Sequence, residues 1–266
     1  DVAPSRGLGD VYKRQMLIGL AGCGKNQINI KETGTSDNNE QMVQNIYENK
    51  RTEVKQKISE IKERLPETSA EDKGTCGSKA KWYYKDNTLI IYGEGVITED
   101  TWHKSNIVIN TVVIDSGITK LGNNMFSGLG SEVGKNIENF YIADGLEEIG
   151  SSTFVNCDCL SEIVLPPSLY FIDGYTFASC DSLKKIYMTD GVEKIGDSAF
   201  TGCKSLESIF IPKTVRAIGN GVFTGCNNLS DIQISKDNRI FSEKNNCIIN
   251  NLSLIHISEP TRRSYI

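Results

Sequence analysis

The sequence has 266 residues and a formal net charge of −5, with 38% hydrophobic and 24% charged residues. A mildly acidic chain without a basic stripe is a poor candidate for nucleic-acid binding, because phosphate contacts need clustered Lys and Arg. Its apolar runs are all shorter than the roughly 20 residues that cross a bilayer. With only two histidines, His103 and His256, it also lacks most of what histidine-based catalysis or metal binding needs.

The two ends of the chain, residues 1–15 and 252–266, resemble translated sequencing adapters. DVYKRQ back-translates to GAT GTG TAT AAG AGA CAG, which resembles a transposon end used in library construction. LSLIHISEPTR resembles the reverse complement of the same adapter read in frame. Two matches in opposite orientation indicate a native segment of about residues 16–251, so the ends, with His256, carry no functional weight.

Residues 16–23, MLIGLAGC, resemble the end of a bacterial lipoprotein signal. Small residues precede Cys23, and the resemblance implies that the thiol of Cys23 carries a lipid. The chain would then be bound to the membrane through this anchor, on the extracellular face of a bacterial envelope. The alternative is a chance apolar stretch that ends in cysteine.

Residues 24–73 read as a tether that contains one amphipathic helix. Residues 24–39 are polar, and such composition is typical of segments that stay unfolded. Apolar side chains then recur at steps of three, four and seven, and the pattern stops near Pro66: Met42, Val43, Ile46, Tyr47, Val54, Ile58, Ile61 and Leu65. This helix is either a coiled-coil spacer or a helix that lies against the domain. Residues 68–73 are expected to be a second polar linker.

Residues 107–251 contain an internal repeat of 23 residues. Five columns keep this step: Phe140, Ile163, Ile186, Ile209 and Ile232; Ile149, Ile172, Ile195 and Ile218; Phe154, Phe177, Phe200 and Phe223; Cys157, Cys180, Cys203 and Cys226; Leu160, Leu183, Leu206 and Leu229. An earlier copy with Val112, Leu121 and Phe126 is offset by an insertion near residues 131–135. So short a period predicts a solenoid in which each unit is stabilised by its neighbours.

One unit can be divided further by its pattern. Residues 186–188 alternate inward and outward as a short strand does, and Gly191 turns the chain. A second extended segment ends at Ile195, and residues 197–203 are expected to form a brief helical or 3₁₀ turn. The expected fold is a β-rich α+β solenoid, a right-handed stack of turns of about 23 residues behind a helical or disordered N-terminal tether.

The repeat resembles the BspA-like leucine-rich repeat family, whose consensus runs roughly I-x-I-P-x-x-V-x-x-I-G-x-x-A-F-x-x-C-x-x-L. Residues 207–229 follow it closely through Ile209, Pro212, Ile218, Phe223 and Cys226. Residues 74–106, with GTCG, Trp82 and LIIYGEG, resemble the cap that often precedes such repeats, and residues 232–250 resemble a variant last repeat. The resemblance implies a protein ligand, such as a host matrix component or another bacterial surface protein.

The stacked cysteines Cys157, Cys180, Cys203 and Cys226 form a predicted ladder beside the stacked phenylalanines Phe154, Phe177, Phe200 and Phe223. Adjacent rungs lie about 5 Å apart, within reach of disulfide geometry. A column that points one way offers no tetrahedral metal site. Buried free thiols, disulfides between rungs and a metal or redox site therefore remain three readings, and the first is favoured.

Motifs of catalysis do not occur: there is no G-x-S-x-G, no H-E-x-x-H and no phosphate loop. His103 follows Trp102 in a loop and reads as surface or cap packing. We therefore expect no catalytic residue, no metal and no cofactor.

One residue per turn should point outward from the longer strand, and these residues form the predicted contact stripe: Tyr141, Val164, Tyr187, Phe210 and Gln233. Aromatic side chains give large contact areas at low entropic cost. Their alternative role is to support strand pairing. The sequence thus predicts a non-catalytic surface scaffold for adhesion or protein binding. A targeting module of a larger enzyme and a purely structural envelope protein are the alternatives.

Overall fold

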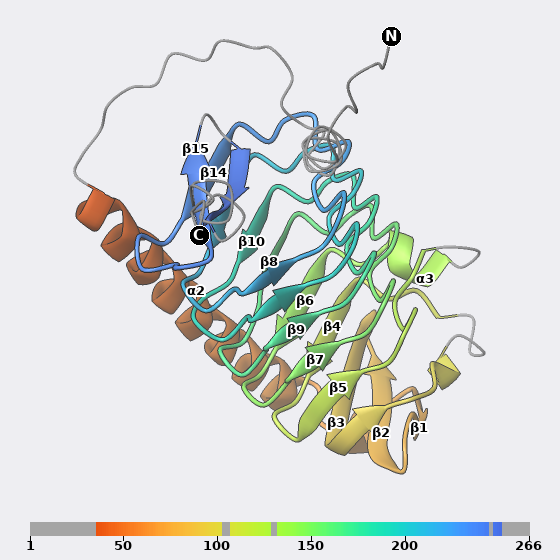
Figure 1. The fold of residues 1–266 in the computed structure, drawn as a ribbon. Helices are drawn as coiled ribbons and strands as arrows, with labels where there is room; N and C mark the ends of the chain where they lie inside the picture. Colours follow the sequence, from red (N-terminus) through yellow and green to blue (C-terminus); the bar gives the residue numbers. More distant parts are fainter. Residues whose placement is uncertain (1–35, 103–106, 129–131, 245–246, 252–266) are drawn as a thin grey trace, which may run out of the picture.

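The computed structural model describes residues 36–102, 107–128, 132–244 and 247–251. The adapter-like ends, the lipobox with Cys23, and His103 lie outside these residues. In the described part, the chain forms a long helix, a small antiparallel cap and a stack of solenoid repeats, each with two short strands (Figure 1). The predicted solenoid with its period of 23 residues is confirmed.

The N-terminal cap is an antiparallel sheet of three strands, β1 (Asp72–Thr75), β2 (Lys79–Lys85) and β3 (Thr88–Ile97). The predicted polar linker ends earlier than expected, because Asp72 already pairs with Tyr84 in this sheet. The rings of Trp82 and Trp102 meet edge to face at 6.4 Å and close the end of the core. The cap thereby covers a first repeat that would otherwise expose its apolar interior.

The repeats build two parallel ladders of strands, one on each side of the core. The first ladder holds β4 (Thr111–Ile114), β6 (Asn139–Ile142), β8 (Glu162–Val164), β10 (Lys185–Tyr187), β12 (Ser208–Ile211) and β14 (Asp231–Ile234). The second ladder continues from β3 through β5 (Ile118–Leu121), β7 (Glu148–Ile149), β9 (Phe171–Ile172), β11 (Lys194–Ile195) and β13 (Ala217–Ile218). A short helix, α3 (Glu132–Lys135), occupies the insertion that offsets the first copy.

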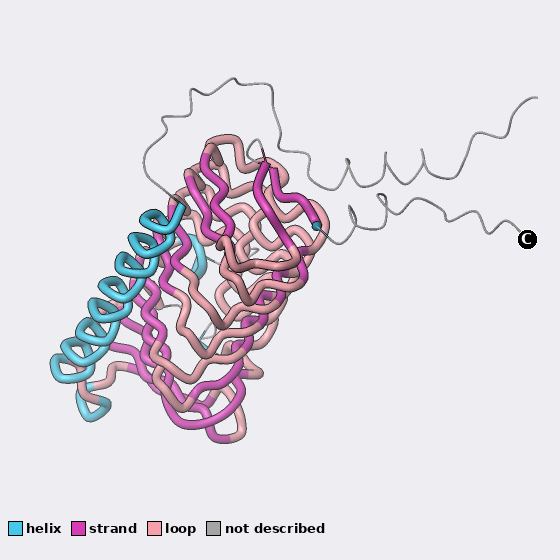
Figure 2. The backbone as a smooth tube through the Cα atoms, turned by 60° about the vertical axis from the view of Figure 1, so that its left-hand side comes forward, coloured by secondary structure: helices cyan, strands magenta, loops and turns pink. Residues whose placement is uncertain are grey.

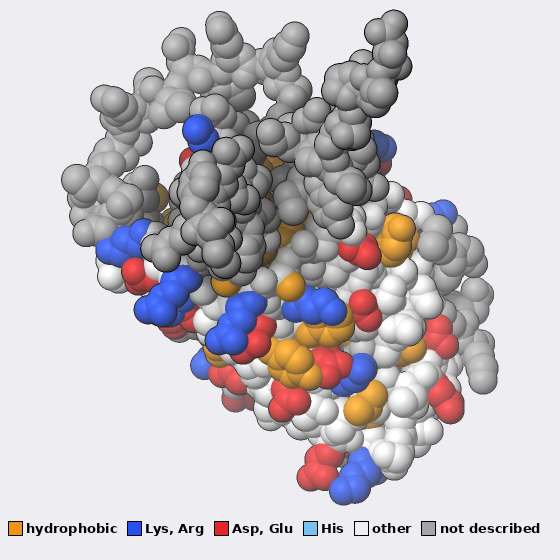
Figure 3. Space-filling model, in the orientation of Figure 1, with side chains coloured by type: hydrophobic (Ala, Val, Ile, Leu, Met, Phe, Trp, Pro, Cys, Tyr) orange, Lys and Arg blue, Asp and Glu red, His pale blue; other side chains and the backbone are white. Residues whose placement is uncertain are grey.

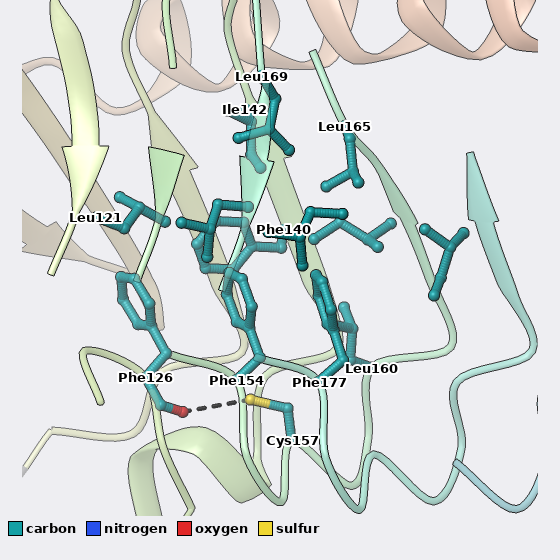
Figure 4. Packing of buried hydrophobic residues seen from close by; sticks show 14 of the residues in the cluster. Leu121, Phe126, Phe140, Ile142, Phe154, Cys157, Leu160, Leu165, Leu169 and Phe177 are labelled. Atoms are coloured by element: carbon teal, nitrogen blue, oxygen red, sulfur yellow. Dashed lines mark hydrogen bonds between the residues drawn. The ribbon is translucent and has the colours of Figure 1, made fainter. Parts of the chain in front are cut away.

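The phenylalanine column is the centre of the core (Figure 4). Phe154, Phe177 and Phe200 are fully buried, and successive rings stack at 5.0 and 5.5 Å. Phe126 extends the stack on one side and Phe223 on the other, where burial is only partial. Stacked rings at this spacing bury large apolar surfaces between every pair of repeats.

Glycine follows the second strand in four of the five repeats, with Asp173 after β9 as the exception, because the backbones approach closely there. A Cβ on Gly196 would lie 2.5 Å from the amide nitrogen of Gly174 in the preceding repeat. A side chain at this place would push the two repeats apart. The isoleucine–glycine pair of the repeat pattern therefore sets the stacking distance.

The last repeat departs from the others. Strand β14 continues the first ladder by pairing with β12, but β15 (Phe241–Lys244) and β16 (Cys247–Asn250) form an antiparallel hairpin. The side-chain amide of Asn238 donates to the carbonyls of Pro212 and Val215, at 2.8 and 3.0 Å. This bond pair ties the hairpin to the previous repeat, so the predicted variant repeat serves as the end of the described stack.

Helix α2 (Ser36–Arg64) lies along the first ladder over its whole length (Figures 1 and 2). Its first four residues overlap the end of the predicted polar stretch. Tyr47, Val54, Ile58, Ile61 and Leu65 are buried against the strands. Of the two predicted roles, the helix therefore has the second: it lies against the domain. A short 3₁₀ turn (Glu67–Ser69) then leads into β1. Among the described residues, no helix is long and apolar enough to cross a membrane.

Candidate binding surfaces

The predicted contact stripe points away from the solenoid core, as expected, but helix α2 covers much of it. Val164 is 5% exposed, and it belongs to the same apolar cluster as Tyr47 and Val54 of the helix. Tyr141 and Tyr187 are partly buried against this cluster. The expectation of an open stripe is thus wrong over β6, β8 and β10, because the apolar face of α2 finds its partner there. Phe210 and Gln233 are half-buried.

Polar contacts fix the position of α2 on this ladder. The Tyr47 hydroxyl donates to the carbonyl oxygen of Leu165 at 2.8 Å. Lys50 pairs with Glu162 at 2.9 Å, with its ammonium 5.7 Å from the centre of the Tyr187 ring. Hydrogen bonds of this kind depend on direction, so they set the register that an apolar contact alone leaves open.

Arg51 is the most deeply buried cation of this interface, with 3% of the residue exposed. It donates to the Ile142 carbonyl at 2.9 Å and pairs with Asp144 at 2.6 Å, and Lys55 reaches the other oxygen of Asp144 at 2.8 Å. Burial opposes the charge on Asp144, but the hydrogen bonds from Lys55 and Arg51 outweigh it and lower the pKa of this carboxyl. The pair therefore holds the middle of α2 to the turn after β6.

A groove of about 340 Å³ remains where α2 meets β6 and β8. Its walls carry both signs of charge, from Lys50, Lys57, Glu53, Glu138 and Glu162. Since Lys50 pairs with Glu53 and Glu162, and Lys57 with Glu60, most of this charge is already neutralised within the chain. The groove has the features of a polar margin of the helix contact and not of an apolar ligand pocket.

The second ladder is open to solvent. Figure 3 shows hydrophobic side chains between acidic and basic ones on the face that carries β5, β7 and β9. Lys120 on β5 forms an ion pair with Glu148 on β7 at 2.5 Å. On the next rungs, the Lys194 ammonium lies 4.8 Å from the centre of the Phe171 ring. This face therefore presents alternating charges and rings.

One repeat of this face differs from its neighbours. The place of Tyr170 is taken by Glu147, Glu193 and Arg216 in the adjoining repeats, and the place of Phe171 by Glu148, Lys194 and Ala217. The place of Tyr175 is taken by Ser152, Ser198 and Gly221. Tyr170 and Tyr175 are 42% and 51% exposed, and they are the two exposed aromatic residues in the described part of the chain. We call Tyr170, Phe171 and Tyr175 the aromatic patch.

Tyr175 also has a costly backbone conformation. Its φ is 57°, in the left-handed region that a bulky residue seldom occupies. Ser152 and Ser198 have the same conformation at the equivalent places, with φ of 58° and 55°, so the turn imposes it. A large exposed ring at such a place is not explained by packing. The aromatic patch was missed in the sequence, although a comparison of the repeats column by column contains the signal.

The cysteine ladder has the features of a structural element and not of a reactive site. The thiols of Cys157, Cys180, Cys203 and Cys226 donate to the carbonyls of Phe126, Phe154, Phe177 and Phe200, at 3.2, 2.9, 3.0 and 3.0 Å. All six cysteines whose side chains the structure describes are free. Burial raises the pKa of Cys180, and the contact with Cys180 raises that of Cys203, so these thiols stay protonated. Within the described ranges, no group of His, Cys, Asp and Glu has a metal-binding arrangement.

Comparisons with known proteins agree with this architecture. Residues 132–255 match the family model described as "BspA type Leucine rich repeat region", in six copies. A leucine-rich repeat protein from Eubacterium ventriosum aligns with 68% of this chain at 24% identity and a TM-score of 0.59. The alignment covers 48% of that protein, so this chain spans about half of its length.

A leucine rich cell surface protein from Faecalibacterium prausnitzii aligns with 69% of this chain and 59% of its own, at 20% identity and a TM-score of 0.47. A search of the curated proteins finds no match. The six-copy family match and the parallel ladders repeating every 23 residues agree on the same unit. Residues 132–255 of this chain are thus similar to leucine-rich repeat regions of the BspA type.

Proposed function

We propose that this chain is a non-catalytic scaffold on the bacterial cell surface that binds a protein partner through the aromatic patch of its open ladder. The observation that carries the proposal is the departure of one repeat from its neighbours at Tyr170, Phe171 and Tyr175. The repeats directly before and after it have polar residues at these outward places, and the next repeat has Arg216, Ala217 and Gly221, so stacking does not require aromatic rings there. Exposed aromatic side chains are enriched among residues that dominate protein interfaces.

The aromatic patch is a better candidate than the predicted contact stripe. Val164 and Tyr187 already bury apolar surface against α2, so a partner would first have to displace the helix. The rings of the aromatic patch lie on β9 and the backbone next to it, which pairs with β7 and β11 in a fixed register, and this lowers the entropy lost on binding. Binding there needs no rearrangement of the described structure.

The place of the protein in the cell is part of the proposal. The lipobox-like residues 16–23 support a lipid anchor at Cys23, and the BspA-type repeats support a position outside the cell. Metabolic labelling with a fatty acid tests the anchor: a Cys23→Ala variant should lose a label that the parent carries. Host matrix proteins and surface proteins of other bacteria are the partner classes that the family resemblance suggests.

The decisive experiment compares the parent with two double variants in binding to immobilised matrix proteins and bacterial surface proteins. Tyr170→Ser/Tyr175→Ser should lose the partner that the parent retains. Met42→Ser/Val108→Ser removes apolar groups that are 61% and 52% exposed elsewhere, so it is a matched control and should still bind. A third variant, Tyr187→Ser/Phe210→Ser, reports on the covered stripe. Equal retention of the partner by the parent and the Tyr170→Ser/Tyr175→Ser variant would contradict the proposal.

A further inference from the structure

In its row of the open ladder, Tyr170 lies between two glutamates, one on each adjoining rung. The Tyr170 amide donates to the Glu147 carbonyl at 3.0 Å, and the Glu193 amide donates to the Tyr170 carbonyl at 2.9 Å. The three residues are therefore adjacent on successive rungs, which lie about 4.8 Å apart. Glu147 and Glu193 therefore lie on the rungs on either side of Tyr170, whose hydroxyl reaches Glu148 beside Glu147.

The negative charges of these two carboxylates are not neutralised by ion pairs within the described residues. Within the described ranges, neither Glu147 nor Glu193 forms an ion pair, whereas the adjacent Glu148 is engaged by Lys120 and by the Tyr170 hydroxyl. Arg216 lies one rung beyond Glu193, on the side away from Tyr170. The surface around the ring is thus negative toward Glu147.

The hydrogen bond from Tyr170 to Glu148 fixes the direction of the ring before any partner arrives. This hydrogen bond raises the pKa of Tyr170, and burial and the charges of Glu148 and Glu147 act in the same direction. The effect of Glu147 agrees with a carboxylate close to the ring. Tyr170 is therefore a neutral, oriented aromatic surface with negative charge at its side.

The neighbouring ring of the same repeat, Phe171, is in contact with a cation. Lys194 lies over Phe171 with its ammonium 4.8 Å from the ring centre, which is a cation–π distance. Phe171 thus receives its cation from within the chain. Tyr170 belongs to the column one residue before that of Phe171. In its column, the residues of the adjoining repeats are Glu147 and Glu193, so no cation is supplied.

We infer that the open ladder binds an arginine side chain of the protein partner, stacked on Tyr170 between Glu147 and Glu193. The inference rests on the proposed function of the aromatic patch and names the chemistry that it recognises. A guanidinium is planar, so it stacks on a ring while its edge donates paired hydrogen bonds to a carboxylate. A lysine ammonium offers a compact charge without that plane, and it should bind less well.

The test uses the full chain, labelled with ¹⁵N, and three blocked peptides of glycine and serine that differ in one central residue: arginine, lysine or citrulline. Citrulline keeps the shape of arginine and removes its charge. The arginine peptide should shift the amide signals of residues 147, 170 and 193, the lysine peptide should bind severalfold more weakly, and the citrulline peptide should not bind.

Two variants locate the contact. Glu147→Gln/Glu193→Gln should weaken binding of the arginine peptide about tenfold or more, which corresponds to about 1.4 kcal/mol. Glu138→Gln/Glu207→Gln changes the net charge equally at exposed carboxylates on the other side of the repeats, and it should leave binding unchanged. Tyr170→Leu keeps an apolar side chain but removes the ring, and it should remove the preference for arginine over lysine.

Equal binding of the arginine and citrulline peptides, or equal losses in the two glutamate variants, would overturn the inference. The partner-binding experiment separates this from failure of the proposed function. If Tyr170→Ser/Tyr175→Ser loses the partner while the arginine peptide shows no advantage, the face binds by other chemistry and only the inference fails. If that variant keeps the partner, the proposed function itself is wrong.

Discussion

The hydroxyl of Tyr47 donates a hydrogen bond to the carbonyl oxygen of Leu165 at 2.8 Å, across 118 residues of sequence. Both partners are buried at the contact, and burial raises the pKa of Tyr47, so the hydroxyl keeps its proton. This bond joins the middle of α2 to the end of β8. It is one reason why the helix is part of the domain and not a free spacer.

Tyr47→Phe should destabilise the docked helix by about 1 kcal/mol, the net contribution of one buried hydrogen bond, since the ring itself stays in place. Amide hydrogen exchange of α2 should become faster, while exchange in the phenylalanine core stays unchanged. Thr52→Ala, which removes an exposed bond within the helix, is the control and should have little effect. Unchanged protection of α2 in Tyr47→Phe would mean that this contact does not hold the helix.

The Arg51–Asp144 pair should make helix docking sensitive to acid. The pKa of Asp144 is lowered in the folded chain from an ordinary value of 3.8. A lowered folded pKa means that the stabilisation is fully present above the ordinary value and is lost as the pH falls through the folded value. Because the Asp144 side chain is 43% exposed, the contribution should be on the order of 1 kcal/mol at neutral pH.

The free energy of unfolding of the parent and of Asp144→Asn, measured from pH 7 to pH 2.5, checks this prediction. The difference between the two proteins should be constant above about pH 5 and should shrink below pH 4. A difference that grows with acid would contradict the assigned direction of the shift.

Phe200→Ala should cost about 3–5 kcal/mol, because the ring is fully buried between Phe177 and Phe223 and its loss leaves a cavity in the stack. Urea unfolding should show a lower midpoint and a broader transition, since each repeat is stabilised mainly by its neighbours. Phe223→Ala should cost less, as Phe223 is only partly buried near the end of the stack. Equal losses at the two positions would mean that burial does not control the energetics of the column.

Among the cysteines that the structure places, Cys159 should react first with a thiol reagent. Its side chain is exposed, whereas Cys157, Cys180 and Cys203 are buried and donate to backbone carbonyls. Alkylation followed by peptide mapping should mark Cys159 in the native protein and the buried three only after unfolding. Rapid native labelling of Cys180 would show that the ladder opens to solvent.

The sequence by itself determined the solenoid and its core. Columns such as Phe154, Phe177 and Phe200 keep a step of 23 residues, and each of these side chains packs mainly on the same column of the next repeat. The contacts that build such a core are encoded in the repeat itself, so periodicity alone predicts them. The amphipathic pattern of residues 42–65 likewise predicted the helix.

Only the tertiary structure decided what covers the outward residues. The alternation around Val164 and Tyr187 shows that they leave the core, but an outward residue is exposed only if nothing packs on it, and α2 does. The pattern of α2 shows an apolar face without naming its partner, because hydrophobic contact has no direction. The first ladder is buried because α2 docks on it, and Tyr170 is exposed because nothing in the described structure packs on the second ladder. Both depend on contacts between residues far apart in the sequence, which a local pattern does not contain.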